Sequence, residues 1–342
     1  MKYRQLGKTG VLVSELCLGT MTFGGKGYWK AIGQLPENDV TQLIKTAIDQ
    51  GINFFDTANA YSEGLAETLL GKALKNLGIS RQMSFIATKV RLRMGEGPNQ
   101  VGLSKLHIQD SVNDSLHRLG LSHIDMLYIH GVDPITSLEE TMRGLEDVVS
   151  SGKVRYLGVS NHPAWMVVKA NSIAGNLGWS KFVASQNFYS IASRDIEREI
   201  VPMALSEGIS IMPWSPLAGG VLSGKYTRDI KTAGSSRRDN FDFPPINKEK
   251  AFDIIDVMIK IGQRYKISAA RVALSWIKDK PGVGSVIIGA KNKEQLLDNL
   301  ACTQLQLTSD EIKELETVSA LTPEYPGWMV DRQLTGRFPE TR

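Results

Sequence analysis

Cysteine is scarce in this sequence, and long apolar runs are absent from it. Only Cys17 and Cys302 occur among 342 residues, which excludes a disulfide framework and is typical of a reducing compartment. No stretch reaches the roughly 18 apolar residues of a membrane-spanning helix. Met1–Gln5 is not followed by the apolar segment of a signal peptide. We therefore expect a cytoplasmic protein with no membrane partner.

An excess of positive charge is also nearly absent. The chain has 40 Lys and Arg against 36 Asp and Glu, which gives a formal net charge of +4. Nucleic-acid-binding proteins concentrate basic residues on one face to neutralise many phosphates, so this small excess argues against a nucleic-acid partner. The hydrophobic share of 42% and the charged share of 22% match a folded globular protein.

Eight short apolar runs alternate with longer stretches of helical periodicity. The first seven runs begin 27 to 40 residues apart, whereas 75 residues separate the starts of the last two. This alternation is typical of a parallel sheet with crossover helices. The predicted strands are Leu16–Thr20, Ile52–Asp56, Ser84–Lys89, Ile124–His130, Val154–Ser160, Phe182–Asn187, Ile209–Trp214 and Gly284–Ile288.

Eight strands and their helices in about 300 residues favour a closed α/β barrel over an open sheet. Helices are predicted at Leu35–Gln50, Ser104–Leu119, Ser137–Ser151 and Lys291–Cys302, and a hairpin at Tyr3–Leu6 and Val11–Ser14. We therefore predict a single domain over residues 1–342. It is a (β/α)8 TIM barrel with an N-terminal β-hairpin and a long loop after strand seven.

Two common nucleotide-binding motifs are missing. Gly95-x-Gly97 and Gly282-x-Gly284 lack the third glycine of a dinucleotide fingerprint. Gly219–Lys225 has the spacing of a P-loop, but Tyr226 stands where Ser or Thr would bind Mg²⁺. A kinase or NTPase is therefore disfavoured, although backbone N–H groups and a lysine here can still meet a phosphate.

Polar residues stand where the predicted strands end. In a βα barrel these carboxyl ends meet at one mouth, where the chemistry gathers. Tyr61 follows the second strand by five residues. The strand-end residues are Asp56, Lys89, His130, Ser160 with Asn161, and Gln186 with Asn187.

Four of these side chains together suit the reduction of a carbonyl. The developing alkoxide needs a proton, and the hydroxyl of Tyr61, with an ordinary pKa of about 10, is a weak acid at neutral pH. A nearby Lys89 ammonium would lower that pKa, Asp56 would hold the ammonium, and a neutral His130 would polarise the substrate oxygen. Taken alone, each of these four residues also fits a purely structural role. Lys89 is also a candidate Schiff-base nucleophile of a lyase or isomerase. No metal is required.

The chain resembles the aldo-keto reductases through nearly its whole length. The resemblance is carried by Leu16–Gly25, Asn53–Tyr61, Ala87–Lys89, Asp125–His130, Gly152–Asn161, Trp214–Lys225 and Ile288–Asn299. It implies a (β/α)8 barrel that reduces carbonyls with NAD(P)H through a tetrad at Asp56, Tyr61, Lys89 and His130. The pattern is most similar to the branch of aryl-alcohol-dehydrogenase-like enzymes and potassium-channel β subunits.

The resemblance also implies a cofactor site, covered by a loop at residues 215–246. Ser160, Asn161 and Gln186 would hold the nicotinamide carboxamide, and Trp214 would stack on its ring. The implied cofactor-binding residues are Gly19, Thr20, Met21, Asp56, Ser160, Asn161, Gln186, Trp214, Ser215, Pro216, Leu217, Gly219, Lys225, Arg237, Gly289, Lys291, Gln295, Asp298 and Asn299.

The predicted cofactor is NADPH (NADP+), with NADH as an alternative. Many relatives read the 2′-phosphate with an arginine where Gln295 stands here, so Lys291 with Arg237 or Arg238 would supply the charge. Between Lys225 and Arg238, five basic residues and one acid give 5 − 1 = +4. This local excess equals that of the whole chain and indicates an anion site.

Substrate specificity is expected from Met21–Ile32, Arg91–Leu103 and the tail Thr322–Arg342. Their candidate substrate residues are Tyr28, Trp29, Arg91 and Trp328. The aromatic residues suggest an aromatic carbonyl, whereas Arg91, Arg93 and Arg332 suggest a charged or sugar-like one, and both remain open. We predict reversible reduction of an aldehyde or ketone to an alcohol with the proton from Tyr61. The alternative is a redox-sensing regulatory subunit with little turnover. The sequence does not indicate an oligomeric state.

Overall fold

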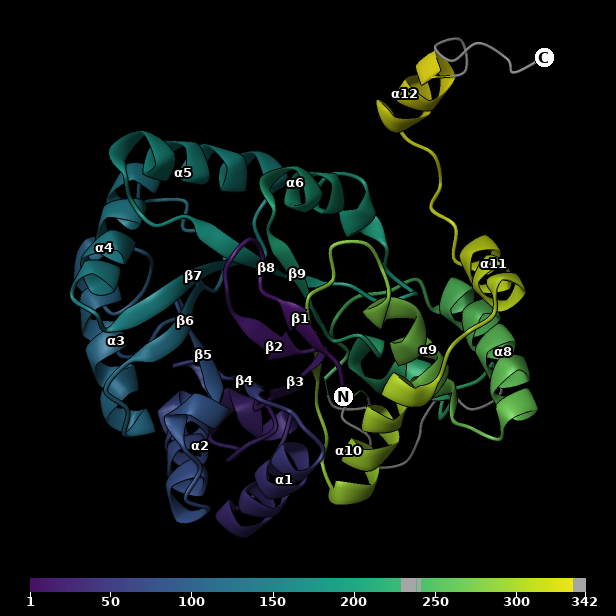
Figure 1. Cartoon of the computed structure of the whole chain (residues 1–342), viewed down its shortest axis with the longest axis horizontal. Coiled ribbons are helices and arrows are strands. Elements are labelled where there is room, and N and C mark those ends of the chain that lie inside the picture. The colour runs from purple at the N-terminus through teal and green to yellow at the C-terminus, as the bar shows by residue number, and fades with distance from the viewer. Residues whose placement is uncertain (229–237, 239–240, 335–342) are drawn as a thin grey trace.

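The computed structural model describes residues 1–228, 238 and 241–334 of the chain (Figure 1). Within them, eight parallel strands form a nearly closed barrel in the order β10-β3-β4-β5-β6-β7-β8-β9. The end strands meet at a parallel bridge between Ile211 and Val283. The strands are β3 (Leu16–Gly19), β4 (Phe54–Asp56), β5 (Phe85–Val90), β6 (Ile124–Ile129), β7 (Val154–Ser160), β8 (Phe182–Phe188), β9 (Ser210–Trp214) and β10 (Val286–Ile288). The predicted barrel is confirmed.

Apart from the last one at the C-terminus, the helices surround the barrel (Figure 1) and bury apolar residues. They are α1 (Glu37–Asp49), α2 (Leu65–Asn76), α3 (Lys105–Leu119), α4 (Leu138–Ser150), α5 (Ala164–Leu177), α6 (Ile200–Glu207), α8 (Lys248–Tyr265), α9 (Ala269–Lys278), α10 (Lys293–Leu300), α11 (Ser309–Val318) and α12 (Gly327–Leu334). Helix α10 begins later than predicted because the side chain of Asn292 accepts from the N–H of Gln295 and caps it. Lys291 therefore precedes the helix.

The predicted N-terminal hairpin consists of β1 (Tyr3–Gln5) and β2 (Leu12–Ser14), paired antiparallel. It lies across the barrel in Figure 1, and its Leu6 and Val13 are fully buried against the interior side chains. The N–H of Gly7 donates to Oγ of Ser210 at 2.7 Å, at the start of β9. The hairpin therefore closes the end of the barrel where the strands begin.

The barrel interior is filled by side chains of alternating strand positions. Its buried cluster includes Cys17, Phe54, Ala87, Met126, Tyr128, Ala184 and Met212. Because side chains of one strand face the same side at every second position, the next inward positions toward the carboxyl ends are occupied by Asp56, Lys89, His130, Gln186 and Trp214. These mostly polar residues therefore form the last layer of the barrel interior, at the carboxyl ends of the strands, and the apolar layers lie beneath them.

The C-terminal helix lies away from the barrel. The tail is tied to the body where Arg198 donates to the carbonyl oxygen of Thr322 at 3.1 Å and pairs with Glu324 at 3.0 Å. Beyond it, α12 has no buried residue and stands clear of the other helices (Figure 1). In the described part of the chain, no helix is both long enough and apolar enough to cross a membrane.

Candidate active site

Lys89 is the centre of the polar layer at the barrel mouth. Its ammonium nitrogen lies 2.5 Å from Oδ2 of Asp56, 2.8 Å from the carbonyl oxygen of Thr57 and 3.2 Å from the hydroxyl oxygen of Tyr61. An ammonium has three N–H donors, so each donor has one acceptor here. The side chain of Lys89 is fully buried and that of Asp56 is 2% exposed. The ion pair is therefore held in place away from bulk water.

The surroundings favour the charged form of this lysine. Burial opposes the charge, but the negative charge of Asp56 and the contact with Tyr61 outweigh burial and raise the pKa of Lys89 above its ordinary value. Oδ1 of Asp56 also accepts from Nε2 of Gln186 at 2.8 Å. Residues from β4, β5 and β8 are thereby joined in one buried network.

The position of Tyr61 is set by the short helix η2 (Tyr61–Gly64) that follows β4. Ser62 and Glu63 have left-handed backbones, at φ 50° and 55°. The buried Ser62 hydroxyl donates to the carbonyl oxygen of Phe23 at 2.7 Å and accepts from the N–H of Gly25 at 2.9 Å. A strained turn persists only where its surroundings hold it, so the loop before α1 fixes the phenol of Tyr61.

His130 stands beside this phenol at the end of β6. The rings of Tyr61 and His130 are 5.8 Å apart between centroids. Burial lowers the pKa of His130 well below its ordinary value, and the charges of Lys89 and Arg91 lower it further. The imidazole is therefore neutral at physiological pH and has one N–H to donate.

Several buried polar atoms at this mouth have no hydrogen-bond partner among the described residues. They include Oγ1 of Thr20, both side-chain polar atoms of Asn59 and Nδ1 of His130. A buried polar atom without a partner costs about 1–3 kcal/mol, so such atoms gathered at one place fit a bound polar ligand. Thr20, with Gly19 and Met21, follows β3, and its N–H donates to the carbonyl oxygen of Asp56 at 2.9 Å.

Trp214 ends β9 and lies at the side of the mouth where the nicotinamide is predicted. Its indole N–H donates to Oδ1 of Asn161 at 2.9 Å, and Nδ2 of Asn161 donates to Oγ of Ser160 at 2.9 Å. The ring packs against Phe188 at 5.0 Å and is stacked with Phe243 at 5.8 Å. The three predicted residues Ser160, Asn161 and Trp214 are therefore adjacent and mutually held.

The loop after β9 is a tight turn built from residues of positive φ. Residues Ser215, Ala218, Gly219 and Gly220 all have positive φ, and the N–H of Gly219 donates to Oγ of Ser215 at 2.9 Å. No described heavy atom lies within 4 Å of a Cβ placed on Gly220. The N–H groups of Ala218 and Gly220 donate to the carbonyl oxygens of Ser215 and Leu217 at 2.8 and 2.9 Å, so the turn is held by its own hydrogen bonds, and the space at Gly220 leaves room for a ligand to approach the backbone. Pro216 and Leu217 lie on the same loop, and Lys225 follows it as an exposed residue.

Arg238 helps to hold the backbone of this loop in place. Its Nη1 donates to the carbonyl oxygen of Ala218 at 3.1 Å, and its Nε lies 2.7 Å from the carboxylate of Asp242. The side chain is only 6% exposed. The sequence suggested Arg237 or Arg238 as a phosphate ligand; Arg238 instead braces the loop, and Arg237 lies outside the described residues.

The predicted adenosine site lies around the start of α10. Oε1 of Gln295 accepts from the N–H of Lys291 at 3.0 Å, and Nδ2 of Asn299 donates to the carbonyl oxygen of Gly289 at 3.1 Å. Asp298 pairs with Arg271 at 2.7 Å. Sequence reasoning missed Arg271, because an arginine on α9 carries no signal until folding brings it beside Asp298.

The structure brings three of the four predicted substrate residues to the mouth. The ring of Trp29 is 4.9 Å from that of Tyr61, and Tyr28 contacts both Trp29 and Phe241, at 5.7 and 5.5 Å. Arg91 follows β5 beside His130. Trp328 lies on the distant α12 (Figure 1), so the prediction that the tail contacts the substrate is not supported.

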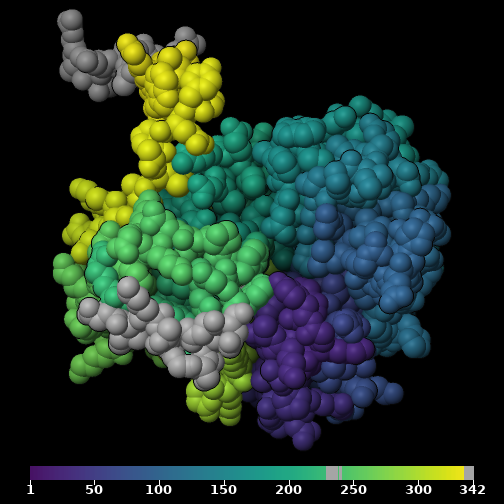
Figure 2. Space-filling model, turned by 180° about the vertical axis from the view of Figure 1, so that it is seen from behind, coloured from purple at the N-terminus to yellow at the C-terminus, as the bar shows by residue number. Residues whose placement is uncertain are grey.

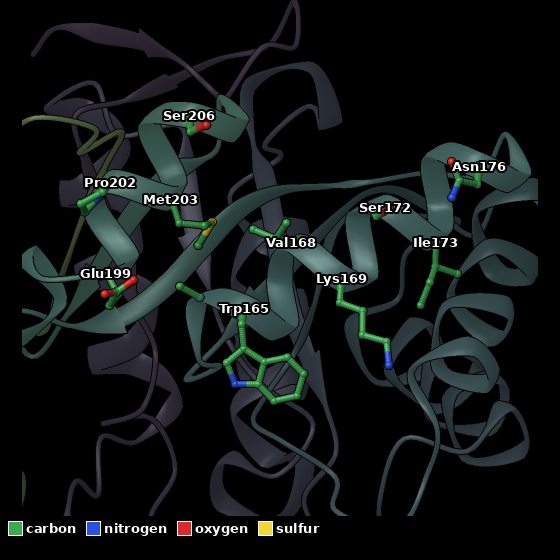
Figure 3. Close-up of a pocket in the computed structure, with 11 residues that line it drawn as sticks. Trp165, Val168, Lys169, Ser172, Ile173, Asn176, Glu199, Pro202, Met203 and Ser206 are labelled. Carbon is green, nitrogen blue, oxygen red and sulfur yellow. The ribbon is translucent and has the colours of Figure 1, made fainter. Parts of the chain in front are cut away.

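Figure 2 shows the molecule from behind, where the first residues (purple) adjoin those that follow β9 (green). The contact between the rings of Tyr28 and Phe241 joins these two segments. A groove of about 820 Å³ lies elsewhere, on the outer surface between α5 and α6, lined by Trp165, Val168 and Met203 among others (Figure 3). It contains none of the predicted site residues.

Comparison with known proteins identifies relatives over the whole barrel. A model of the aldo/keto reductase family matches residues 15–320. A Schizosaccharomyces pombe protein that is provisionally named an aryl-alcohol dehydrogenase is 38% identical to this chain, and the match covers 92% of this chain and 94% of that protein. The versiconal hemiacetal acetate reductase of Aspergillus parasiticus is 35% identical, covering 96% and 99%. A protein of Oryza sativa named a probable voltage-gated potassium channel subunit beta is 33% identical, covering 95% and 94%.

Proposed function

The chain belongs to the aldo/keto reductase family of NAD(P)H-dependent oxidoreductases, and from this premise we propose that it reversibly reduces an aldehyde or ketone with NADPH and that Tyr61 donates the proton. One observation carries the proposal. The ammonium of Lys89 contacts the hydroxyl of Tyr61 and the carboxylate of Asp56 in the buried top layer of the barrel. A proton donor, a cation that stabilises its conjugate base and the counter-ion of that cation are therefore in contact.

Each member of the tetrad has a distinct role in this proposal. Tyr61 gives its hydroxyl proton to the carbonyl oxygen as negative charge develops there. Lys89 stabilises the phenolate that remains, and Asp56 keeps Lys89 protonated in spite of burial. The neutral His130 donates its N–H to the carbonyl oxygen and orients the substrate. A bound reduced nicotinamide nucleotide supplies the hydride.

The remaining predicted residues would hold the nucleotide. Ser160 and Asn161 suit the carboxamide and Trp214 one face of the ring, while the loop of Ser215–Gly220 suits the pyrophosphate. Since Arg238 is already bonded to Ala218 and Asp242, we assign the recognition of a 2′-phosphate to Lys291. NADH remains the alternative cofactor.

The same geometry argues against a Schiff-base lyase or isomerase. A lysine nucleophile must lose its proton, whereas the ion pair with Asp56 raises the pKa of Lys89. A redox-sensing regulatory subunit is the second candidate, because relatives named as potassium-channel β subunits match almost the whole chain.

The test is turnover of a panel of aromatic and aliphatic aldehydes with NADPH, followed by nicotinamide absorbance, with nucleotide affinity measured separately. A reductase oxidises NADPH only when an accepted aldehyde is present. Tight nucleotide binding without turnover of any aldehyde would favour the regulatory subunit. Failure to bind either NADPH or NADH would contradict both functions.

A further inference from the structure

Arg91 lies beside the tetrad, and the roles proposed for the tetrad do not include it. It follows β5 directly, and the pairing of Val90 with Ile129 puts it level with His130. Its Nε donates to the carbonyl oxygen of Val132 at 3.2 Å, so its side chain lies over the turn that follows His130. The guanidinium is close enough to lower the pKa of both His130 and His162. A cation therefore lies beside the end of β6, next to His130.

In the described part of the chain, no carboxylate forms an ion pair with this guanidinium. Among the residues that the structure describes, its one hydrogen bond is the bond from Nε to Val132. The nearby Asp133 is engaged elsewhere: it accepts from the N–H of Leu103 at 2.7 Å and from the hydroxyl of Thr136 at 2.7 Å. An arginine has five N–H donors in a planar fork that matches a carboxylate. Most of these donors stay available beside His130.

The backbone of Arg91 is strained. Its φ is 147°, in the range that favours glycine. The N–H of Gly102 donates to its carbonyl oxygen at 2.9 Å and helps to hold this conformation. Strain of this kind costs about 1–3 kcal/mol and collects at functional sites.

The other two arginines that the sequence offered for a charged substrate are placed differently. Arg93 donates from Nη1 to the carbonyl oxygens of Gly95 and Gly97, both at 2.9 Å, and so shapes its own loop. Arg332 is exposed on the distant α12. Arg91 alone of the three stands beside the tetrad.

We propose that Arg91 binds an anionic group of the substrate, so that the preferred substrate is an aldehyde or ketone carrying a carboxylate or a similar anion near the carbonyl. This inference rests on the proposed reductase function and names its substrate class. The ring of Trp29 contacts that of Tyr61, with 4.9 Å between centroids, so an aromatic surface lies beside the proton donor and an aromatic aldehyde with an anionic substituent is a suitable probe.

The test compares 4-carboxybenzaldehyde with 4-nitrobenzaldehyde, which are matched in shape but differ in charge. The ratio of their kcat/KM values cancels any general effect on the tetrad. We expect Arg91→Gln to lower this ratio by about tenfold, the size of one charge-assisted contact, and Arg91→Lys to restore part of it. Arg93→Gln is the matched control and keeps the wild-type ratio. A ratio within twofold of wild type in Arg91→Gln would overturn the inference.

A binding experiment separates this inference from the reductase proposal. Tryptophan fluorescence is titrated with benzoate and with benzamide in the absence of nucleotide. Wild type and Arg93→Gln should bind benzoate more tightly, and Arg91→Gln should lose that preference while its Tm stays near wild type. If no aldehyde is reduced but benzoate preference depends on Arg91, the anion site stands and the reductase function fails. Equal affinity of wild type for the two probes would refute the anion site.

Discussion

The ammonium nitrogen of Lys89 lies 3.2 Å from the hydroxyl oxygen of Tyr61 and 4.8 Å from the centre of its ring. The cation thus contacts the one atom of the phenol whose charge would change on proton transfer. Because Asp56 and Gln186 extend the contact into the barrel, the geometry of the phenol depends on residues from four different segments.

Tyr61→Phe removes the hydroxyl and keeps the ring against Trp29 and His130. We expect kcat for aldehyde reduction to fall by about 10²–10⁴-fold, the range for loss of a general acid, and the Kd for NADPH to change less than twofold. Tyr28→Phe, at the same mouth but not in contact with Lys89, is the control. A Tyr61→Phe enzyme with near wild-type kcat would exclude this residue as the proton donor.

Lys89→Met leaves the carboxylate of Asp56 buried without its cation. Removing one partner of a buried ion pair costs about 3–5 kcal/mol of unfolding free energy, so urea denaturation should show a loss of that order. Asp56→Asn in the same chain should recover part of the loss, because an uncharged amide needs no counter-ion. Simple addition of the two single losses in the double variant would show that the pair is not coupled.

The barrel itself was predictable because its signals are local and repeated. The alternating pattern predicted all eight strands, and the polar strand ends predicted that Asp56, Lys89 and His130 lie at one mouth. The boundary of β4 differs because Asn53, predicted inside the strand, uses its side chain to accept from the N–H of Ser14 and to donate to the carbonyl of Leu12. These two hydrogen bonds join residues about 40 positions apart in the sequence, so no periodic pattern predicts them.

The parts that could not be predicted depend on partners distant in sequence. Arg238 is clamped by Ala218, and Asp298 is paired with Arg271. No local pattern distinguishes a clamped arginine from one that is available to a ligand. Likewise, the aromatic residues of the tail suggested a substrate contact, but the course of the chain after Glu324 carries Trp328 away from the mouth (Figure 1).

Trp214 should report nucleotide binding directly. Its ring is partly exposed and held by the bond to Asn161, so a nicotinamide stacked on it would quench its fluorescence. We expect NADPH to quench wild-type emission and Trp214→Phe to lose most of that quenching while still binding nucleotide. Trp165→Phe, on the exposed outer face, is the matched control. Undiminished quenching in Trp214→Phe would place the nicotinamide elsewhere.

Lys291 should set the preference between the two nucleotides. If it contacts a 2′-phosphate, Lys291→Ala raises the Kd for NADPH by about tenfold, equivalent to about 1.4 kcal/mol, and leaves the Kd for NADH within about twofold. Lys293→Ala, an exposed lysine two residues away, controls for the general positive potential. A parallel loss for both nucleotides in Lys291→Ala would show that this lysine does not read the 2′-phosphate.

The buried histidines predict how the stability of the fold depends on pH. Burial lowers the pKa of His130 and of His162 from the ordinary value of 6.5 in the folded state. Below that value the unfolded chain takes up protons that the folded chain does not, so the free energy of unfolding falls as the pH falls.

Between about pH 7.5 and pH 5.5 each such histidine should lower the free energy of unfolding by up to about 1.4 kcal/mol. Urea denaturation at both pH values measures this loss, and His130→Gln should reduce it by one histidine's share. An equal loss in wild type and His130→Gln would mean that His130 takes up its proton in the folded protein as readily as in the unfolded chain, and would remove the basis for treating it as a neutral donor.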